Sequence, residues 1–213
     1  MRYRYILWDW NGTLTDDMPC AKQAVNDLLA DRSRSPITDT QYYAYIDTPI
    51  RRFYERVFDL ETESYEDIIR TYNMYYRRHM ETHGGLRPHT ETLLRELRDN
   101  GICQWVVTAS NTADVEQYLN RFAVREYFDR VLGADNYRAE SKVERVARAI
   151  RAVCTDAKCV LVVGDTLHDK ELADAIGADC ALLSGGHQAA ELLQAAKPRY
   201  LCASMQELRE EIL

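Results

Sequence analysis

The chain has 213 residues, of which 46% are hydrophobic and 29% charged, with only 9 glycines and 5 prolines. This length fits one to two domains and this composition is typical of a globular protein, so wholesale disorder, a fibre and a repeat array are excluded. Acidic residues outnumber basic ones by 34 to 27, giving a net charge of −7. That balance disfavours non-specific binding to nucleic acid or to an anionic membrane, but a small anionic ligand responds only to local charge.

The first residues and the cysteines both favour a cytoplasmic protein. The opening segment, MRYRYILWDW, lacks the apolar core and the small-residue cleavage site of a secretory signal. The six cysteines form no Cys-x-x-Cys pair and lie at Cys20, Cys103, Cys154, Cys159, Cys180 and Cys202. We therefore expect reduced, mostly buried thiols rather than a disulfide framework or a zinc site.

Short apolar runs that predict strands recur along the chain. The first covers residues 3–9, ends abruptly at Asp9 and precedes the turn-forming pair Asn11 and Gly12. The others lie at residues 102–108, 130–133, 159–164, 179–183 and 199–202. Segments with helical periodicity separate them, and this alternation predicts an α/β fold with a doubly wound, Rossmann-like parallel sheet.

Several helix ends carry recognisable signals. Ser141 with Glu144 and Ser204 with Glu207 fit the capping box that begins a helix. Gly101 follows a helical segment at the place where a glycine commonly ends one. These signals set the expected helix boundaries on both sides of the predicted strands.

Residues 17–86 interrupt this alternation, because they contain no convincing strand and predict about four helices. We therefore predict an α/β core over residues 1–16 and 87–213, with an inserted all-helical cap domain over 17–86. The insert is rich in tyrosine, including Tyr42, Tyr43, Tyr45, Tyr54, Tyr72, Tyr75 and Tyr76. Packing within the cap and against the sheet is the simpler role for them, and direct substrate recognition is the alternative.

Polar side chains stand at the ends of the predicted strands, where parallel α/β sheets bind their ligands. They are carboxylates, hydroxyls and an amide, at Asp9, Thr108, Ser110, Asn111, Asp165 and Asp169. One ammonium, that of Lys142, lies at the start of the helix that Ser141 opens. Such a set suits phosphoryl transfer with Mg²⁺, which prefers hard oxygen ligands. Asp9 can attack phosphorus to form an aspartyl-phosphate, provided that a metal and an ammonium neutralise the repulsion between two anions.

Four motifs of the sequence resemble those of a known family. DWNGTL at 9–14, the apolar run ending in Thr108, Lys142, and GDTLHD at 164–169 resemble the four motifs of the haloacid dehalogenase-like hydrolase superfamily, in order and over essentially the whole chain. The helical insert resembles the type 1 cap of the phosphoglycolate phosphatase-like branch. Four motifs in order, each at a predicted strand end or helix start, are far more specific than any one of them.

The resemblance implies a role for each matching residue. Catalytic roles fall to Asp9, Asn11, Thr108 and Lys142, with Asp9 as the nucleophile. Metal ligands would be Asp9, the backbone carbonyl of Asn11, Asp165 and Asp169. Substrate contacts would come from Gly12, Thr13, Ser110 and Asn111, and from Arg51 or Arg52 in the segment that resembles the specificity loop of the cap.

Asn11 departs from the family pattern, because most phosphatases of the superfamily carry there an aspartate that protonates the leaving alcohol and activates water. An amide cannot do this, and such assistance is typically worth about 10² to 10⁴ in rate. The substitution leaves open a slow phosphatase, a borrowed acid, and a phosphate-binding protein with little turnover. The candidates for a borrowed acid are Asp16, Asp17, His168 and His187, each of which also suits an ordinary loop role.

Two related chemistries fit less well. Phosphonoacetaldehyde hydrolase-like members also lack that aspartate but need a cap lysine for a Schiff base, and Lys22 is the only lysine between residues 18 and 86. Haloacid dehalogenases use no magnesium, whereas Asp165 and Asp169 favour a metal. We therefore predict a cytoplasmic, Mg²⁺-dependent phosphatase, a monomer or homodimer, that acts on a small phosphorylated metabolite. The alternative is a catalytically weak member that binds a phosphorylated ligand.

Overall fold

The computed structural model describes residues 2–47, 49–135 and 141–213. Six strands form one sheet in the order β3-β2-β1-β4-β5-β6, and every neighbouring pair is parallel. The strands are β1 (Tyr5–Trp8), β2 (Cys103–Asn111), β3 (Arg130–Ala134), β4 (Val160–Gly164), β5 (Asp179–Leu183) and β6 (Tyr200–Cys202). The predicted α/β fold with a doubly wound sheet is confirmed.

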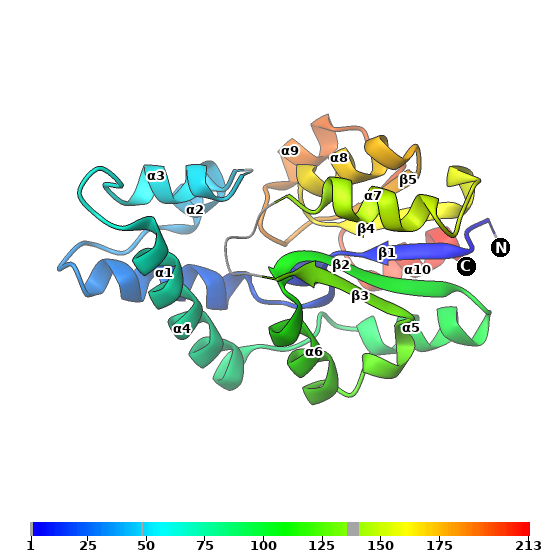
Figure 1. Cartoon of the computed structure of the whole chain (residues 1–213), viewed down its shortest axis with the longest axis horizontal. Helices are drawn as coiled ribbons and strands as arrows, with labels where there is room; N and C mark the ends of the chain where they lie inside the picture. Colours follow the sequence, from blue (N-terminus) through cyan, green and yellow to red (C-terminus); the bar gives the residue numbers. More distant parts are fainter. Residues whose placement is uncertain (1, 48, 136–140) are drawn as a thin grey trace.

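Helices cover both faces of the sheet, so the core has three layers (Figure 1). One face is covered by α5 (Thr90–Asp99), α6 (Thr112–Arg121) and α10 (Met205–Ile212). The other face is covered by α7 (Val143–Arg151), α8 (Leu167–Ile176) and α9 (Ala190–Ala195). Both chain ends lie at the amino ends of the strands (Figure 1). The carboxyl ends of the strands point the other way, toward the helices that follow β1 in the sequence.

The strands are buried on both faces, which explains their nearly continuous apolar sequences. Successive side chains of a strand point to opposite faces of the sheet. Within β1, Ile6 and Trp8 pack with the helices of one layer, while Leu7 packs with those of the other. All five residues of β4 are buried. The centre of the sheet is therefore buried on both faces and supports the loops at its carboxyl edge.

The first four α-helices after β1 in the sequence stand beyond the carboxyl edge of the sheet (Figure 1). They are α1 (Met18–Ala30), α2 (Asp39–Tyr45), α3 (Arg51–Val57) and α4 (Tyr65–His83). They bury an apolar cluster of their own, which includes Leu28, Phe53 and Ile68. A bridge between Thr15 and Leu86 pairs the two chain segments that enter and leave them. The division into a core and a cap at residues 16/17 and 86/87 stays a prediction.

The predicted helix signals differ in outcome. Ser204 accepts a hydrogen bond from Glu207 N at 3.1 Å and begins α10 as predicted, but the Glu207 side chain accepts from Ala203 N rather than from Ser204 N, so the capping box is only half formed. Gly101 follows α5 at a φ of +77°, which confirms that prediction. The capping box predicted at Ser141 is wrong, because Lys142 is the residue that precedes α7, and Ser141 Oγ accepts its hydrogen bond from Val143 N at 3.4 Å rather than from Glu144 N. Lys142 itself is buried.

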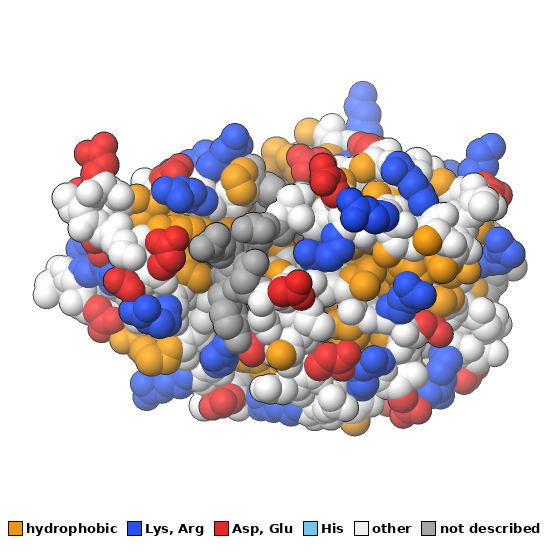
Figure 2. Space-filling view, in the orientation of Figure 1, with side chains coloured by type: hydrophobic (Ala, Val, Ile, Leu, Met, Phe, Trp, Pro, Cys, Tyr) orange, Lys and Arg blue, Asp and Glu red, His pale blue; other side chains and the backbone are white. Residues whose placement is uncertain are grey.

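The exposed surface shown in Figure 2 carries Lys and Arg side chains interspersed with Asp and Glu, without a large region of one sign. Five of the six cysteines are buried, as predicted. Among the residues that the structure describes, no helix is both long and apolar enough to cross a membrane.

Candidate active site

A tight turn follows β1 and brings the first loop against two others. Asp9 N donates a hydrogen bond to Val163 O of β4 at 2.8 Å, and the next residues form a kinked helical turn in which Gly12 has a φ of +68°. A Cβ atom on Gly12 would lie 2.2 Å from Asp165 Oδ2 and 2.6 Å from a ring carbon of His187. Glycine is therefore required here twice, by the left-handed backbone and by the close approach of the loops after β4 and β5.

We expect Gly12→Ala to lower the free energy of unfolding by about 2 kcal/mol or more, because it combines a strained backbone with overpacking. Gly85→Ala is the matched control, since a Cβ there would meet no atom within 4 Å and the backbone φ is not in the left-handed region. Urea unfolding of both variants measures the difference. Equal stabilities of the two variants would contradict the packing of the three loops described above.

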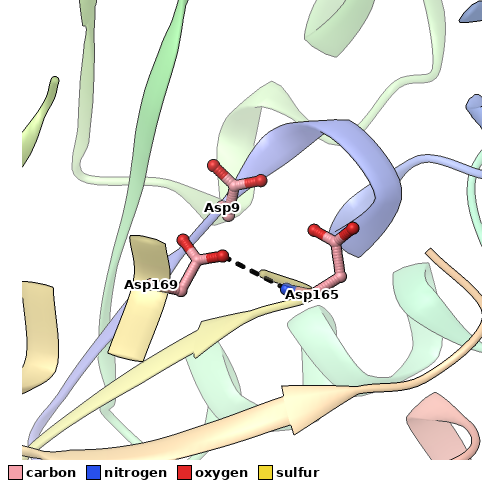
Figure 3. Close-up of side chains that lie close together, drawn as sticks. All are labelled: Asp9, Asp165 and Asp169. Carbon is pink, nitrogen blue, oxygen red and sulfur yellow. Dashed lines mark hydrogen bonds between the residues drawn. The ribbon is translucent and has the colours of Figure 1, made fainter. Parts of the chain in front are cut away.

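Three buried carboxylates meet at the carboxyl edge of the sheet (Figure 3). Asp9 follows β1, Asp165 follows β4, and Asp169 lies in the first turn of α8. One oxygen from each carboxylate lies within 4.8 Å of the others. The predicted convergence of these three residues is thus observed, and carboxylate oxygens at this spacing are the donors that Mg²⁺ prefers.

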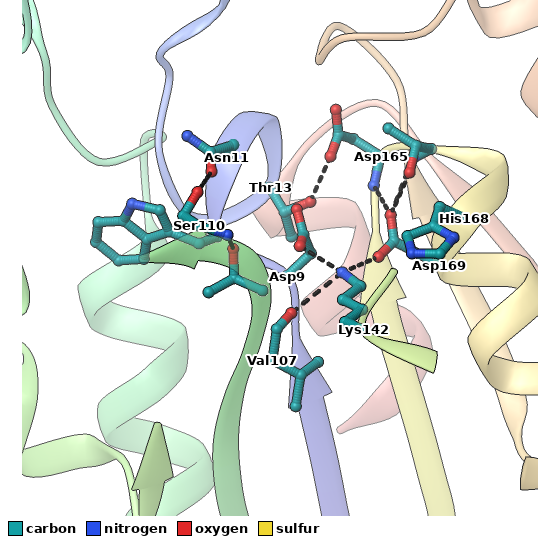
Figure 4. Close-up of polar contacts among 12 residues, drawn as sticks. Asp9, Asn11, Thr13, Val107, Ser110, Lys142, Asp165, His168 and Asp169 are labelled. Atoms are coloured by element: carbon teal, nitrogen blue, oxygen red, sulfur yellow. Dashed lines mark hydrogen bonds and ion pairs between the residues drawn. The ribbon is translucent and has the colours of Figure 1, made fainter. Parts of the chain in front are cut away.

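Lys142 inserts its ammonium between two of these carboxylates (Figure 4). Its Nζ donates to Asp9 Oδ1 at 2.5 Å, to Asp169 Oδ1 at 2.6 Å and to Val107 O at 3.1 Å. The side chain is only 3% exposed, so its charge acts in a low-dielectric environment. Lys142 therefore orients Asp9 and leaves the other oxygen of that carboxylate, Oδ2, without a hydrogen bond from the described residues.

The charges of the cluster do not balance within it. Burial raises the pKa of Asp9 well above its ordinary value, and the Asp169 and Asp165 carboxylates raise it further, against the lowering effect of Lys142. Burial also raises the pKa of Asp165. One ammonium faces three carboxylates, so a divalent cation held among their oxygens would neutralise the excess negative charge. The donor set, its spacing and its charge therefore fit Mg²⁺.

Asn11 is held at both ends of its amide. Its Nδ2 donates to Asp17 Oδ2 at 2.8 Å, and its Oδ1 accepts a hydrogen bond from Ser110 Oγ at 2.5 Å (Figure 4). The side chain is therefore fixed by a buried carboxylate on one side and a hydroxyl on the other. It holds no acidic proton, so it cannot protonate a leaving group.

Asp17 is the buried partner of Asn11 and lies in a dense set of donors. Its carboxylate accepts hydrogen bonds from Gly12 N at 2.5 Å, Thr15 Oγ1 at 3.0 Å and Tyr76 OH at 2.7 Å, and its Oδ1 lies 3.4 Å from Nε2 of His187. Burial opposes ionisation, but the charge of His187 and the hydrogen bonds lower the pKa of Asp17 to about 2. Burial likewise opposes protonation of His187, but the Asp17 carboxylate raises the pKa of this imidazole to about 9.

His187 and Thr13 also orient Asp165. The backbone N of His187 donates to Asp165 Oδ2 at 2.6 Å, and Thr13 Oγ1 donates to Asp165 Oδ1 at 2.8 Å. The ring Nδ1 of His187 lies 2.8 Å from the hydroxyl of Tyr42 in α2. The Thr13 hydroxyl therefore orients Asp165, a predicted metal ligand, and Thr13 does not line the substrate cavity. Packing against the sheet was the simpler role expected for the cap tyrosines, and Tyr42 and Tyr76 do contact its loops. Their individual partners could not be predicted, because no pattern in the sequence pairs them with a particular core loop.

The hydroxyl and amide residues of β2 lie along the strand itself rather than after it, since β2 continues to Asn111. Thr108 is buried, and its Oγ1 accepts a hydrogen bond from Ser110 N at 3.0 Å. The Asn111 side chain accepts a hydrogen bond from Ala113 N at 3.0 Å and caps α6. Thr108, Ser110 and Asn111 all line the cavity that opens above Asp9.

Comparisons with known proteins agree with this geometry. The family model described as haloacid dehalogenase-like hydrolase matches residues 6–183. This chain belongs to that family. A phosphoglycolate phosphatase from Neisseria meningitidis serogroup A is 25% identical over 217 residues, which cover 97% of this chain and 92% of that protein.

Two solved structures show the same fold as this hydrolase. A predicted phosphoglycolate phosphatase from Haemophilus somnus has a TM-score of 0.84 at 21% identity, covering 100% of this chain and 99% of that one. CbbY from Rhodobacter sphaeroides, solved in complex with phosphate, has a TM-score of 0.78 at 22% identity, covering 97% of this chain and 96% of that one. The predicted superfamily is confirmed, and the relatives agree with the predicted branch.

Some predicted residues of this hydrolase lie apart from the cavity. Arg51 and Arg52 are 56% and 58% exposed in their side chains and form ion pairs with Glu55 and Asp47, and neither arginine lines the cavity. Their role in substrate binding stays a prediction. Of the candidates for a borrowed acid, Asp16 is exposed, while the structure brings the other three to the lining.

Proposed function

We propose that this hydrolase is a Mg²⁺-dependent, phosphoglycolate phosphatase-like enzyme that cleaves a small phosphomonoester through an aspartyl-phosphate intermediate. The observation that carries the proposal is the convergence of the Asp9, Asp165 and Asp169 carboxylates, two of which, Asp9 and Asp169, bind the ammonium of Lys142. The names of the sequence relatives support phosphatase chemistry. The cavity above Asp9 is about 250 Å³, which suits a small substrate.

The residues around Asp9 suit a two-step displacement. With Oδ1 held by Lys142, Asp9 Oδ2 attacks phosphorus, and a bond from this oxygen to phosphorus forms as the bond to the leaving alcohol oxygen breaks. Water then attacks the aspartyl-phosphate, which releases inorganic phosphate and restores the carboxylate. Lys142 and the Thr108 hydroxyl lie at the same edge and would hold phosphoryl oxygens, one as a point charge and the other as a hydrogen-bond donor.

The carboxylates of Asp9, Asp165 and Asp169, with the Asn11 backbone carbonyl, would hold the magnesium ion. When bound, this ion supplies neutralising charge to the phosphoryl group. Thr13 and the His187 backbone fix the orientation of Asp165, so the ligand set is held before the cation arrives.

The amide at position 11 supports a slow enzyme. Asn11 is engaged by Asp17 and Ser110 and offers the leaving alcohol no acidic proton. The loss of general acid-base help, about 10² to 10⁴ in rate, falls mainly on esters of poorly acidic alcohols. The same observation supports the second candidate, a catalytically weak member that binds a phosphorylated ligand, because nucleophile, metal site and lysine all remain.

We expect the protein to release phosphate from para-nitrophenyl phosphate with Mg²⁺, at least about 10²-fold faster than from an alkyl phosphate, because the nitrophenolate leaves without protonation. Chelation of the metal should remove this activity. Phosphate release measured with both esters, with and without EDTA, tests the proposal. Absence of release together with ligand-dependent thermal stabilisation would favour the binding protein. Equal rates on the two esters would show that another acid is present.

A further inference from the structure

A continuous wall of aromatic rings bounds the cavity on the side of α2, α3 and α4. We call Tyr42, Phe53, Tyr54, Tyr72 and Tyr76 the aromatic wall. Successive ring centroids lie 5.6, 5.4, 5.9 and 5.8 Å apart in that order. The two end members reach the loops of the sheet, since Tyr42 contacts His187 and Tyr76 donates to Asp17. The wall therefore spans the roof of the site from one loop to the other.

The space beside the aromatic wall is largely apolar. Aliphatic lining comes from Val25, Ile46, Pro49, Ile50 and Ile69. The cavity of about 250 Å³ lies just below the roughly 300 to 1,000 Å³ of pockets for drug-sized ligands. Once a phosphoryl group occupies the polar end at Asp9, the remaining space fits a compact group of about the size of one ring.

Positive charge is confined to the polar end. In the described part of the chain, the basic side chains that line the cavity are Lys142, His168 and His187. Lys142 is bound to two carboxylates, His187 is paired with Asp17, and Nδ1 of His168 lies 2.9 Å from Glu171.

The remaining charged residues of the lining away from the phosphoryl end are acidic. Asp47 and Asp114 line the cavity, and their arginine partners Arg56 and Arg77 are bound to them at 2.7 Å and 2.9 Å without lining it. A second anionic group on a substrate would thus meet apolar rings and carboxylates rather than a cation. Burying a charge without a partner is costly, whereas burying a ring against other rings is favourable.

We propose that the preferred substrates are phosphomonoesters whose leaving alcohol is uncharged and carries one ring or an equally compact apolar group, and that esters with a carboxylate or second phosphate are disfavoured. This proposal rests on the proposed function, and it names the class of substrate for that site. The aromatic wall supplies the contact surface, and the absence of a second cation among the described lining residues supplies the discrimination.

Three esters test the proposal because they share the same benzyl phosphate group and differ only in the substituent at the 4-position of the ring. They are benzyl phosphate, 4-carboxybenzyl phosphate and its neutral amide, 4-carbamoylbenzyl phosphate. Their dissociation constants are measured by calorimetry with Mg²⁺ on Asp9→Asn, which cannot form the covalent intermediate. We expect the carboxylate to bind about 10- to 100-fold more weakly than benzyl phosphate, and the amide to bind within a fewfold of it. Equal or tighter binding of the carboxylate would overturn the proposal.

Turnover by the unmodified protein separates this proposal from the proposed function. If no ester releases phosphate but the binding order holds, the phosphatase is wrong and the selectivity stands. If phosphate is released but the charged ester, or phosphoglycolate, is processed as well as benzyl phosphate, the phosphatase stands and the selectivity is wrong.

A cation placed beside the aromatic wall provides the reciprocal test. Ile50 lines the cavity and is half-buried, so Ile50→Arg introduces positive charge beside the aromatic wall. We expect it to reverse the preference by improving binding of 4-carboxybenzyl phosphate about tenfold relative to benzyl phosphate. Met74→Arg, on an exposed position of α4 outside the lining, is the control and should leave the ratio unchanged. An unchanged ratio in Ile50→Arg would contradict the placement of the leaving group.

Discussion

Asp9→Asn is expected to reduce phosphate release by on the order of 10³-fold or more, because the amide cannot serve as the nucleophile that forms the aspartyl-phosphate. The fold should be retained, since Lys142 keeps Asp169 and Val107 O as partners. Asp99→Asn, an exposed aspartate near the end of α5, is the matched control and should behave as the unmodified protein. Phosphate release from para-nitrophenyl phosphate with Mg²⁺ measures the effect. Substantial activity in Asp9→Asn would rule out the covalent mechanism.

The same variant makes a prediction about stability. In the metal-free protein Asp9 is a buried carboxylate beside Asp165 and Asp169, and burial together with these neighbours disfavours its ionised form. Removing it should therefore leave the melting temperature unchanged or raise it, although most substitutions at buried positions destabilise. Thermal unfolding in EDTA provides the measurement, and a large decrease would show that Asp9 is needed for folding as well as for chemistry.

A large gain in turnover is expected when the side chains of Asn11 and Asp17 are exchanged, so that position 11 carries the carboxylate and position 17 the amide. We expect the double variant Asn11→Asp with Asp17→Asn to increase turnover of an alkyl phosphate by about 10² or more, because it places a carboxyl group where a leaving alcohol can be protonated. The hydrogen bonds suit the exchange: an amide oxygen at 17 can accept from Gly12 N and Thr15 Oγ1, and its nitrogen then faces position 11.

The single variant Asn11→Asp separates chemistry from charge. Its new carboxyl would lie beside the Asp17 carboxylate, where Asn11 Nδ2 is now 2.8 Å from Oδ2, and two adjacent carboxylates disfavour double ionisation. We therefore expect a smaller gain than in the double variant. The rates of both variants on alkyl and para-nitrophenyl phosphates measure the difference. A single variant that matches or exceeds the double variant would contradict the assigned coupling between positions 11 and 17.

The residues at the strand ends could be predicted from the sequence. Asp9 and Asp165 each follow an apolar run, and the carboxyl ends of parallel strands share one edge of the sheet, so their convergence follows from topology alone. Lys142 was expected at the start of the helix opened by Ser141, and it directly precedes α7, although the predicted capping box does not form.

The environment of Asn11 could not be predicted in the same way. Asp17 meets His187 only because the loops after β1 and β5 pack together, and this depends on Gly12 rather than on any local pattern. Tyr76 reaches the same carboxylate from the middle of α4. Contacts across such distances in the sequence are set by tertiary packing, which periodicity and spacing do not encode.

The contacts of Tyr76 with Asp17 and of Tyr42 with His187 also connect the position of the helical insert to the state of the active site. Any motion that lifts α2 and α4 from the sheet must break the bond from Tyr76 to Asp17 and the contact of Tyr42 with His187. When a ligand enters, water would reach the buried ion pair of Asp17 and His187. When that water leaves again, the ion pair would be restored. The polar network at the carboxyl edge of the sheet would thus be complete only when α2 and α4 of the helical insert lie against the sheet.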